Sequence, residues 1–181
     1  MRRLLALVSS IIFVDALLFT ALTPLVPKYV DEFDLSKVGA GLLVGAYGAG
    51  AIFGGIPGGL ASARWGPKRT VVASLLLLAV ASFAFASAGS VLALGLARFV
   101  QGVGSTATWA GALTWISVET PRERRGEAIG TAFGVAIFGA ILGPVFGGVA
   151  NAVGIGISFA FCPCSCFRKP KRYVWFCGRH R

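Results

Sequence analysis

The sequence predicts an all-α membrane protein, a bundle of five to six transmembrane helices. Hydrophobic residues make up 56% of the 181 residues and charged residues only 13%, and the mean hydropathy is +0.79. A soluble domain of this length would have to expose much of that apolar surface, so the composition is that of an integral membrane protein. The apolar residues also gather in runs of roughly 20, the length that crosses the hydrocarbon core of a bilayer.

The apolar runs define five complete spans and one partial span. They are separated by short breaks with turn or charge signals, among them KYVDEFDLSK, ARWGPKRT and ETPRERRGE. The predicted spans cover residues 4–26, 39–61, 70–88, 90–115 and 127–150, with a partial sixth span over 152–167. The first run follows two arginines, as a signal peptide would, but Asp15 interrupts it and no clear cleavage site follows. We therefore expect the first run to be a transmembrane helix.

The basic residues predict how these spans are oriented. Lys28 and Lys37 lie in a break where Asp31, Glu32 and Asp34 offset them. Most other basic residues fall on the opposite side: Arg2, Arg3, Arg64, Lys68, Arg69, Arg122, Arg124, Arg125 and those of the tail. The positive-inside rule therefore predicts a multi-pass inner-membrane protein with the N-terminus and the C-terminal tail in the cytoplasm. The net charge of +10 forms no continuous stripe or recognition motif, so no nucleic-acid partner is expected.

Two ionisable residues lie inside predicted spans, Asp15 in the first and Arg98 in the fourth. At 1.5 Å per residue, Asp15 is roughly 17 Å from the inner end of its span and Arg98 roughly 12 Å from the outer end of its own, so their depths nearly match. A charge at that depth costs about 2.5–3.5 kcal/mol on insertion scales, which makes both residues functional-site candidates. Two interpretations stay open: a structural ion pair, or groups that face a cavity and bind substrate or protons.

Small residues and prolines mark helix contacts. Glycines recur every four residues in the second and fifth spans: Gly50, Gly54 and Gly58, then Gly139, Gly143 and Gly147. Membrane helices are rich in glycine in general, but this spacing favours close approach of two backbones. Pro144 removes a backbone donor and is expected to kink the fifth span, with Gly148 nearby letting a neighbour fit. At the start of that span, Thr120, Pro121 and Glu123 match the pattern of a helical capping box.

Four motifs follow one another along the chain. Asp15 precedes TPLVP by eight residues, GLASARWGPKR covers residues 59–69, RFVQGVG covers 98–104, and GAILGPVFGG covers 139–148. Together they resemble the N-terminal six-helix half of the major facilitator superfamily, in particular its drug:proton antiporters. The resemblance over residues 1–157 implies alternating access, a cavity between two halves, and export of a small molecule against inward proton flow.

The resemblance also implies roles for individual residues. Asp15, Arg98 and Gln101 correspond to the proton and substrate pathway. The loop that couples to conformational change corresponds to Gly59, Arg64, Gly66, Lys68 and Arg69. The packing and kink motif corresponds to Gly139, Gly143, Pro144, Gly147 and Gly148. No nucleophile–base pair or metal cluster is visible in the spans, so neither an enzyme nor a cofactor is expected.

The sequence departs from the family pattern in two respects. Ala63 stands where the loop motif carries an acidic residue before its arginine. The family also has about twelve spans, so the chain is expected to be an incomplete or truncated transporter that needs a second half or a second copy. The alternative is a non-transporting scaffold or partner subunit that packs against another chain through its glycine faces.

Residues 158–181 form a basic tail that contains every cysteine of the chain. The C-x-C-x-C spacing differs from the paired C-x-x-C of structural zinc sites, so no metal is expected. A second interpretation is an acylated anchor beside anionic lipid. We favour a third, in which the chain leaves its family pattern near Ser158, as a frameshift or a truncation would produce.

Overall fold

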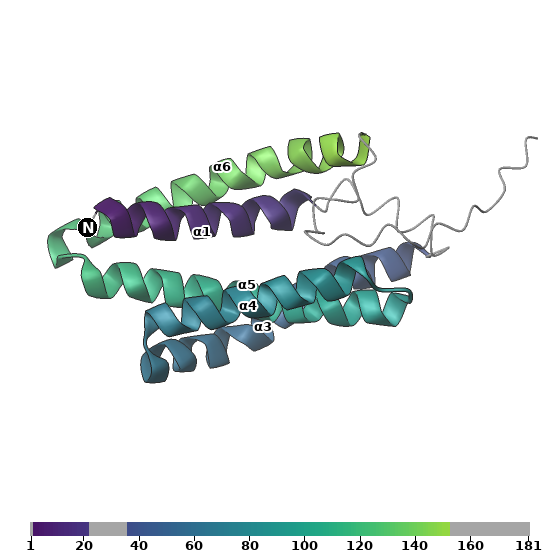
Figure 1. The fold of residues 1–181 in the computed structure, drawn as a ribbon, viewed down its shortest axis with the longest axis horizontal. Coiled ribbons are helices and arrows are strands. Elements are labelled where there is room, and N and C mark those ends of the chain that lie inside the picture. Colours follow the sequence, from purple (N-terminus) through teal and green to yellow (C-terminus); the bar gives the residue numbers. More distant parts are fainter. Residues whose placement is uncertain (1, 22–35, 153–181) are drawn as a thin grey trace, which may run out of the picture.

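The computed structural model describes residues 2–21 and 36–152, and the regular elements within these ranges are all helices (Figure 1). They are α1 (Arg2–Ala21), α3 (Lys37–Trp65), α4 (Pro67–Ala86), α5 (Val91–Glu119), the short 3-10 helix η2 (Arg122–Arg124) and α6 (Arg125–Ala152). The predicted all-α fold is therefore confirmed. The end of the first predicted span, the partial sixth span and the tail lie outside the described residues.

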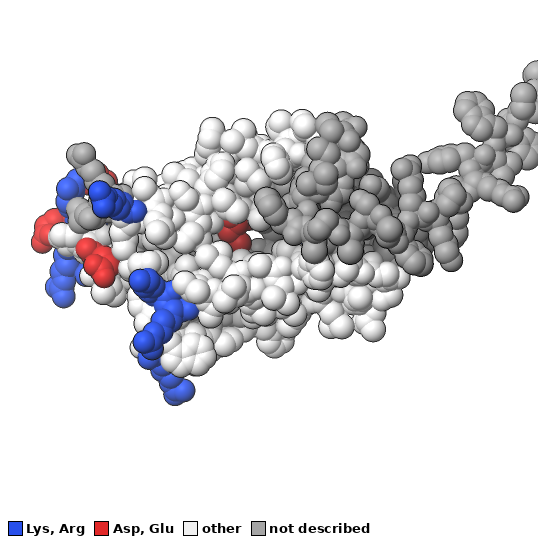
Figure 2. Space-filling view, in the orientation of Figure 1, with Lys and Arg blue, Asp and Glu red and all other residues white. Residues whose placement is uncertain are grey.

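Four helical segments are long and apolar enough to cross a membrane: Arg3–Ala21, Val38–Trp65, Pro67–Phe85 and Arg122–Val149. The fifth long helix, α5, is not among them, although its 29 residues match the length of α3. Buried polar side chains, including Arg98 and Gln101, lower its hydropathy. Among the described residues, charged side chains gather at one end of the bundle, and most of the remaining coloured surface is uncharged (Figure 2). This distribution suits a protein whose sides face lipid.

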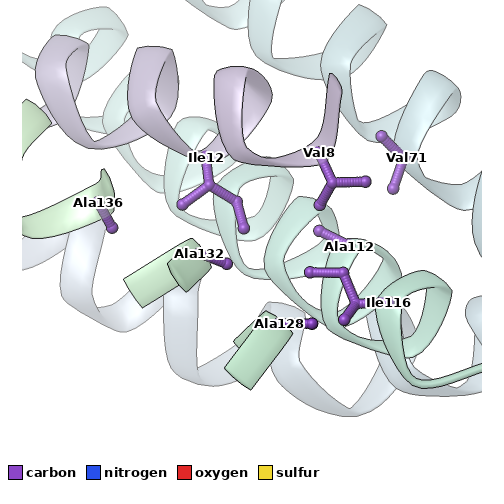
Figure 3. Packing of buried hydrophobic residues seen from close by; sticks show 8 residues of the cluster. All are labelled: Val8, Ile12, Val71, Ala112, Ile116, Ala128, Ala132 and Ala136. Carbon is purple, nitrogen blue, oxygen red and sulfur yellow. The ribbon is translucent and has the colours of Figure 1, made fainter. Parts of the chain in front are cut away.

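The helices form two groups. α5 packs along α3 and α4, and α1 packs along α6, whereas contacts between the two groups are fewer (Figure 1). Where α1, α4, α5 and α6 meet, a small apolar core joins the groups (Figure 3). Its buried members are Val8, Ile12, Val71, Ala112, Ile116, Ala128, Ala132 and Ala136. Alanine supplies half of them, and its short side chain lets helices lie close together where lipid offers no hydrophobic drive for association.

The glycine repeat of α3 faces the backbone of α5. A Cβ at Gly54 would lie 2.7 Å from Val103 Cα, and one at Gly58 would lie 2.7 Å from Ala107 Cα. A Cβ at Gly50 would collide with the Phe99 carbonyl group. The prediction that this face packs closely against another helix is confirmed, and the partner is the helix that carries Arg98.

The turn between α3 and α4 is shorter than the sequence suggests. α3 continues to Trp65 and α4 begins at Pro67, so Gly66 alone separates them. Its φ of 84° and ψ of 153° belong to a region that is essentially restricted to glycine. Pro67 then suits the first turn of α4, because a backbone donor is not needed there.

The expected capping box at the start of the fifth span does not form. Thr120 ends α5 in an extended conformation, and its Oγ1 is buried without a hydrogen-bond partner. Arg125 instead donates from Nε to the Thr120 carbonyl oxygen at 3.0 Å, and η2 intervenes before α6. The prediction was wrong because Thr120 is committed to the end of α5, which places its hydroxyl away from the start of α6.

Candidate functional site

A cavity of about 700 Å³ lies among α1, α3, α4 and α5. Its walls are mostly apolar, with side chains such as Leu18, Leu78 and Phe83. It is also lined by Asp15, Arg98 and Gln101, the three residues that the family resemblance relates to a proton and substrate pathway. Figure 2 shows acidic atoms beside a hollow in the middle of the otherwise uncharged body. The bundle therefore brings residues from opposite groups of helices to one polar site.

Two donors from α5 hold the Asp15 carboxylate of α1. Ser105 donates from Oγ to Asp15 Oδ2 at 2.7 Å, and Trp109 donates from Nε1 to the same oxygen at 2.9 Å. The indole ring of Trp109 also packs against Phe133 of α6, with ring centroids 5.3 Å apart. Charge-assisted hydrogen bonds such as these stabilise a carboxylate and fix its position. Asp15 is thus the polar link between the α1–α6 pair and α5.

Arg98 of α5 also lines the cavity and contacts side chains of three helices. Its Nη1 donates to Gln101 Oε1 at 2.9 Å, and Gln101 Nε2 donates to Ser82 Oγ of α4 at 3.2 Å. The guanidinium carbon lies 5.2 Å from the centroid of the Tyr47 ring and 5.7 Å from that of Phe85. Aromatic faces attract a desolvated cation, so these rings help to retain the charge inside the bundle. Tyr47 is also 4.6 Å from the ring of Phe19 in α1.

The ion-pair interpretation is not realised between Asp15 and Arg98. Among the described residues, the ion pair within 4 Å is Arg124–Glu127, which is exposed and joins η2 to α6. Asp15 is instead satisfied by Ser105 and Trp109. The acid and the base therefore line the same cavity and have different hydrogen-bond partners, Ser105 and Trp109 for Asp15 and Gln101 for Arg98.

The predicted loop residues lie away from this cavity, around the junction of α3 and α4. Arg64, Lys68 and Arg69 are exposed, and a Cβ at Gly59 would meet nothing within 4 Å. None of them lines the cavity. This junction lies at the charged end of the bundle, the same end at which α5 connects to α6 (Figures 1 and 2).

The predicted packing motif of α6 divides between buried and exposed positions. A Cβ at Gly139 would lie 2.7 Å from the Phe13 carbonyl oxygen, and one at Gly143 would lie 2.6 Å from that of Leu17, so both glycines face α1. Gly147 is buried, whereas no described atom would meet a Cβ at Gly148. Pro144 is exposed, and α6 continues through it to Ala152.

Sequence reasoning missed the other hydrogen-bond partners at the site, which are Ser82, Ser105 and Trp109. The available signal was a polar stripe on one helix, since Arg98, Gln101 and Ser105 recur every three or four residues. Trp109 lies four residues after Ser105 on the same stripe, but a mostly apolar tryptophan is not recognisable as polar from the sequence. Within the described ranges no group of three potential metal ligands occurs.

Comparison with known proteins adds a family and three relatives. The family model described as Major Facilitator Superfamily matches residues 8–167. The chain is 29% identical over 119 residues to the 4-hydroxybenzoate transporter PcaK of Pseudomonas aeruginosa, covering 66% of this chain and 27% of PcaK. It is 28% identical over 132 residues to the MFS-type transporter ppzB of Metarhizium rileyi, covering 70% of this chain and 27% of ppzB. It is 32% identical over 99 residues to the cis,cis-muconate transport protein of Acinetobacter baylyi, covering 55% of this chain and 24% of that protein. The chain thus spans about a quarter of the length of these curated relatives.

Proposed function

Because the chain belongs to the Major Facilitator Superfamily, we propose that it forms part of a transporter that carries a small molecule across the membrane. The observation that supports this proposal is the cavity of about 700 Å³ that contains both Asp15 and Arg98. An ionisable side chain inside a membrane bundle is costly and is retained where it serves a polar pathway. The cavity volume also lies in the range of small-molecule sites, about 300–1,000 Å³.

Within this function, we assign proton coupling to Asp15 and infer that the transport is efflux. The carboxyl group faces the cavity and is held by two donors, so protonation would weaken its bonds to Ser105 and Trp109. Those bonds join α1 to α5, so weakening them would loosen the contact between the two groups of helices. The outward direction rests on the resemblance of residues 139–148 to the fifth-helix motif of antiporters.

For the substrate we propose a small organic anion. Arg98 supplies positive charge to the cavity wall and Gln101 supplies amide groups beside it. Two of the relatives are named for transport of 4-hydroxybenzoate and of cis,cis-muconate, which are organic anions. Phe19, Tyr47 and Phe83 provide apolar and aromatic surface for the rest of such a molecule.

The proposal includes a second helical body and an orientation. The cavity opens between helices, and we propose that a second half or a second copy completes it, as alternating access requires two bodies. The basic residues at the charged end of the bundle support placing that end in the cytoplasm. The inner membrane of a cell is then the expected location.

The test uses purified protein reconstituted in liposomes with an imposed pH gradient and radiolabelled 4-hydroxybenzoate. Asp15→Asn is expected to lose gradient-driven flux at least about tenfold while it still binds the compound, because Asn keeps the size of the side chain but cannot release a proton. Arg98→Gln is expected to weaken binding by roughly 10- to 100-fold, the range for losing a hydrogen bond to a charged group. Ser10→Ala is the control, since Ser10 lines the cavity but donates to Ala6 of its own helix.

Gradient-driven flux that persists in Asp15→Asn would contradict the proton assignment. Equal binding by wild type and Arg98→Gln would contradict the choice of an anion. If the wild-type protein neither binds nor moves the compound but forms a stable complex with another membrane protein, the non-transporting scaffold becomes the better description.

A further inference from the structure

A second, shallow and open hollow lies on the outer face of α4, and the residues that line it all belong to this helix. It has a volume of about 420 Å³ and is lined by Lys68, Arg69, Val72, Ala73 and Leu76. The two cations lie in the first turns of α4 and are exposed. Val72 is 52% exposed and Leu76 is 63% exposed, so the apolar part of the hollow also faces the surroundings. None of its residues lines the central cavity.

The positive end of this hollow has no negative partner among the described residues. The first turn of α4 contains no acidic residue, and the ion pair of the described ranges involves neither Lys68 nor Arg69. Arg64, in the last turn of α3, adds a third positive charge at the same junction. The junction of α3 and α4 lies at the charged end of the bundle, where a membrane surface would meet the protein (Figures 1 and 2). A negatively charged group from outside the described chain would be favoured here.

The hollow changes from charged to apolar along the helix axis. Leu76 follows Lys68 by two turns, which places it roughly 12 Å deeper at 1.5 Å per residue. The exposed apolar side chains therefore lie on the hydrocarbon side of the two cations. A phospholipid has the same arrangement, with a phosphate at the surface and an acyl chain below it.

We propose that this hollow binds an anionic phospholipid, with the phosphate between Lys68 and Arg69 and one acyl chain along Val72, Ala73 and Leu76. Charge complementarity selects the anionic headgroup, because each basic residue near a membrane surface adds a similar attraction to anionic lipid, and the hollow has two such residues. The apolar floor selects a lipid over a free phosphate, since a free anion gains nothing from Val72 or Leu76. This site shares no lining residue with the cavity that is proposed for the transported substrate and the proton.

The experiment measures retention of fluorescent phosphatidylglycerol by the purified full chain in neutral detergent micelles. Wild type is expected to retain phosphatidylglycerol in preference to phosphatidylcholine. The double variant Lys68→Gln/Arg69→Gln is expected to weaken retention roughly 30-fold, from the loss of two basic contacts. The matched control is Arg122→Gln/Arg124→Gln, which removes two exposed charges at the same end of the bundle but outside the hollow. That control is expected to stay within about twofold of wild type.

A second arm separates a bound lipid from a bound phosphate. Leu76→Ser is expected to weaken retention of phosphatidylglycerol, and inorganic phosphate at equal concentration is expected not to displace it. The proposal is overturned if the control pair weakens retention as much as the α4 pair, if phosphatidylcholine is retained equally well, or if inorganic phosphate displaces the lipid. Helix content by circular dichroism confirms that each variant is folded.

Discussion

The close contact between α3 and α5 predicts a large difference between two chemically identical substitutions. Gly54→Ala places a Cβ 2.7 Å from Val103 Cα and 2.8 Å from the Val103 carbonyl oxygen. Both are backbone atoms, so no side-chain rotation can relieve the overlap. Gly48→Ala, six residues earlier in the same helix, places its Cβ where nothing lies within 4 Å. Both variants add one methyl group, and they differ only in whether backbone atoms already occupy the space that this group needs.

The magnitude follows from the geometry. Carbon atoms pack best at about 3.5–4.0 Å, so α3 and α5 must separate locally by roughly 1 Å to accept the methyl group, and a gap of that size loses about a quarter to a half of each dispersion contact. Overpacking of this kind costs about 1–3 kcal/mol. The gain in helix propensity from Gly to Ala, about 1 kcal/mol, is common to both variants and cancels in the comparison. Gly54→Ala should thus be about 1–3 kcal/mol less stable than Gly48→Ala.

The assay is reversible unfolding in mixed micelles with increasing dodecyl sulfate, followed by circular dichroism. The midpoint for Gly54→Ala is expected to fall well below that for Gly48→Ala. Equal midpoints for the two variants would refute the reasoning, because they would mean that the backbones of α3 and α5 do not approach closely at Val103.

Two further predictions concern the turn and the Asp15 site. Gly66→Ala should lower the free energy of unfolding by about 1–3 kcal/mol in the same assay, because φ of 84° with ψ of 153° is strained for any residue with a Cβ; an unchanged midpoint would contradict this conformation. Trp109→Phe should destabilise the protein by about 1–3 kcal/mol through loss of the 2.9 Å bond to Asp15. The loss should be much smaller in an Asp15→Ala background, which has no side-chain acceptor for the indole; equal losses in both backgrounds would show that the two residues are not coupled.

Much of the architecture could be predicted from the sequence, because it depends on local pattern. Hydropathy over windows of roughly 20 residues gave the described helices to within a few residues, and the spacing of Gly50, Gly54 and Gly58 identified a packing face. The errors lie where one residue could serve two elements. Thr120 fits the start of one helix but ends the preceding one, and the expected loop around Gly66 contracts to that single residue.

The candidate site was predicted only in part. Asp15 and Arg98 were recognisable because an ionisable side chain within an apolar run is conspicuous, and Gln101 was named only through the family resemblance of residues 98–104. Ser105 and Trp109 were not recognisable, because each is an ordinary residue of a membrane helix until its partner is known. Only the structure showed that Asp15 and Arg98 bond to different partners and do not form an ion pair, since that choice depends on distances between helices.

The sequence by itself thus determined the membrane class, the order of the helices and the presence of an acid and a base at similar depth. These properties follow from the thickness of a bilayer and from the composition of single segments. The tertiary structure decided that α1 pairs with α6, that α5 lies among α3, α4 and α1, and that Asp15 meets residues 90 and 94 positions away. The physical reason is that helices in lipid associate through the shapes of their small-residue faces. Whether two faces fit depends on both helices, so it cannot be predicted from one segment alone.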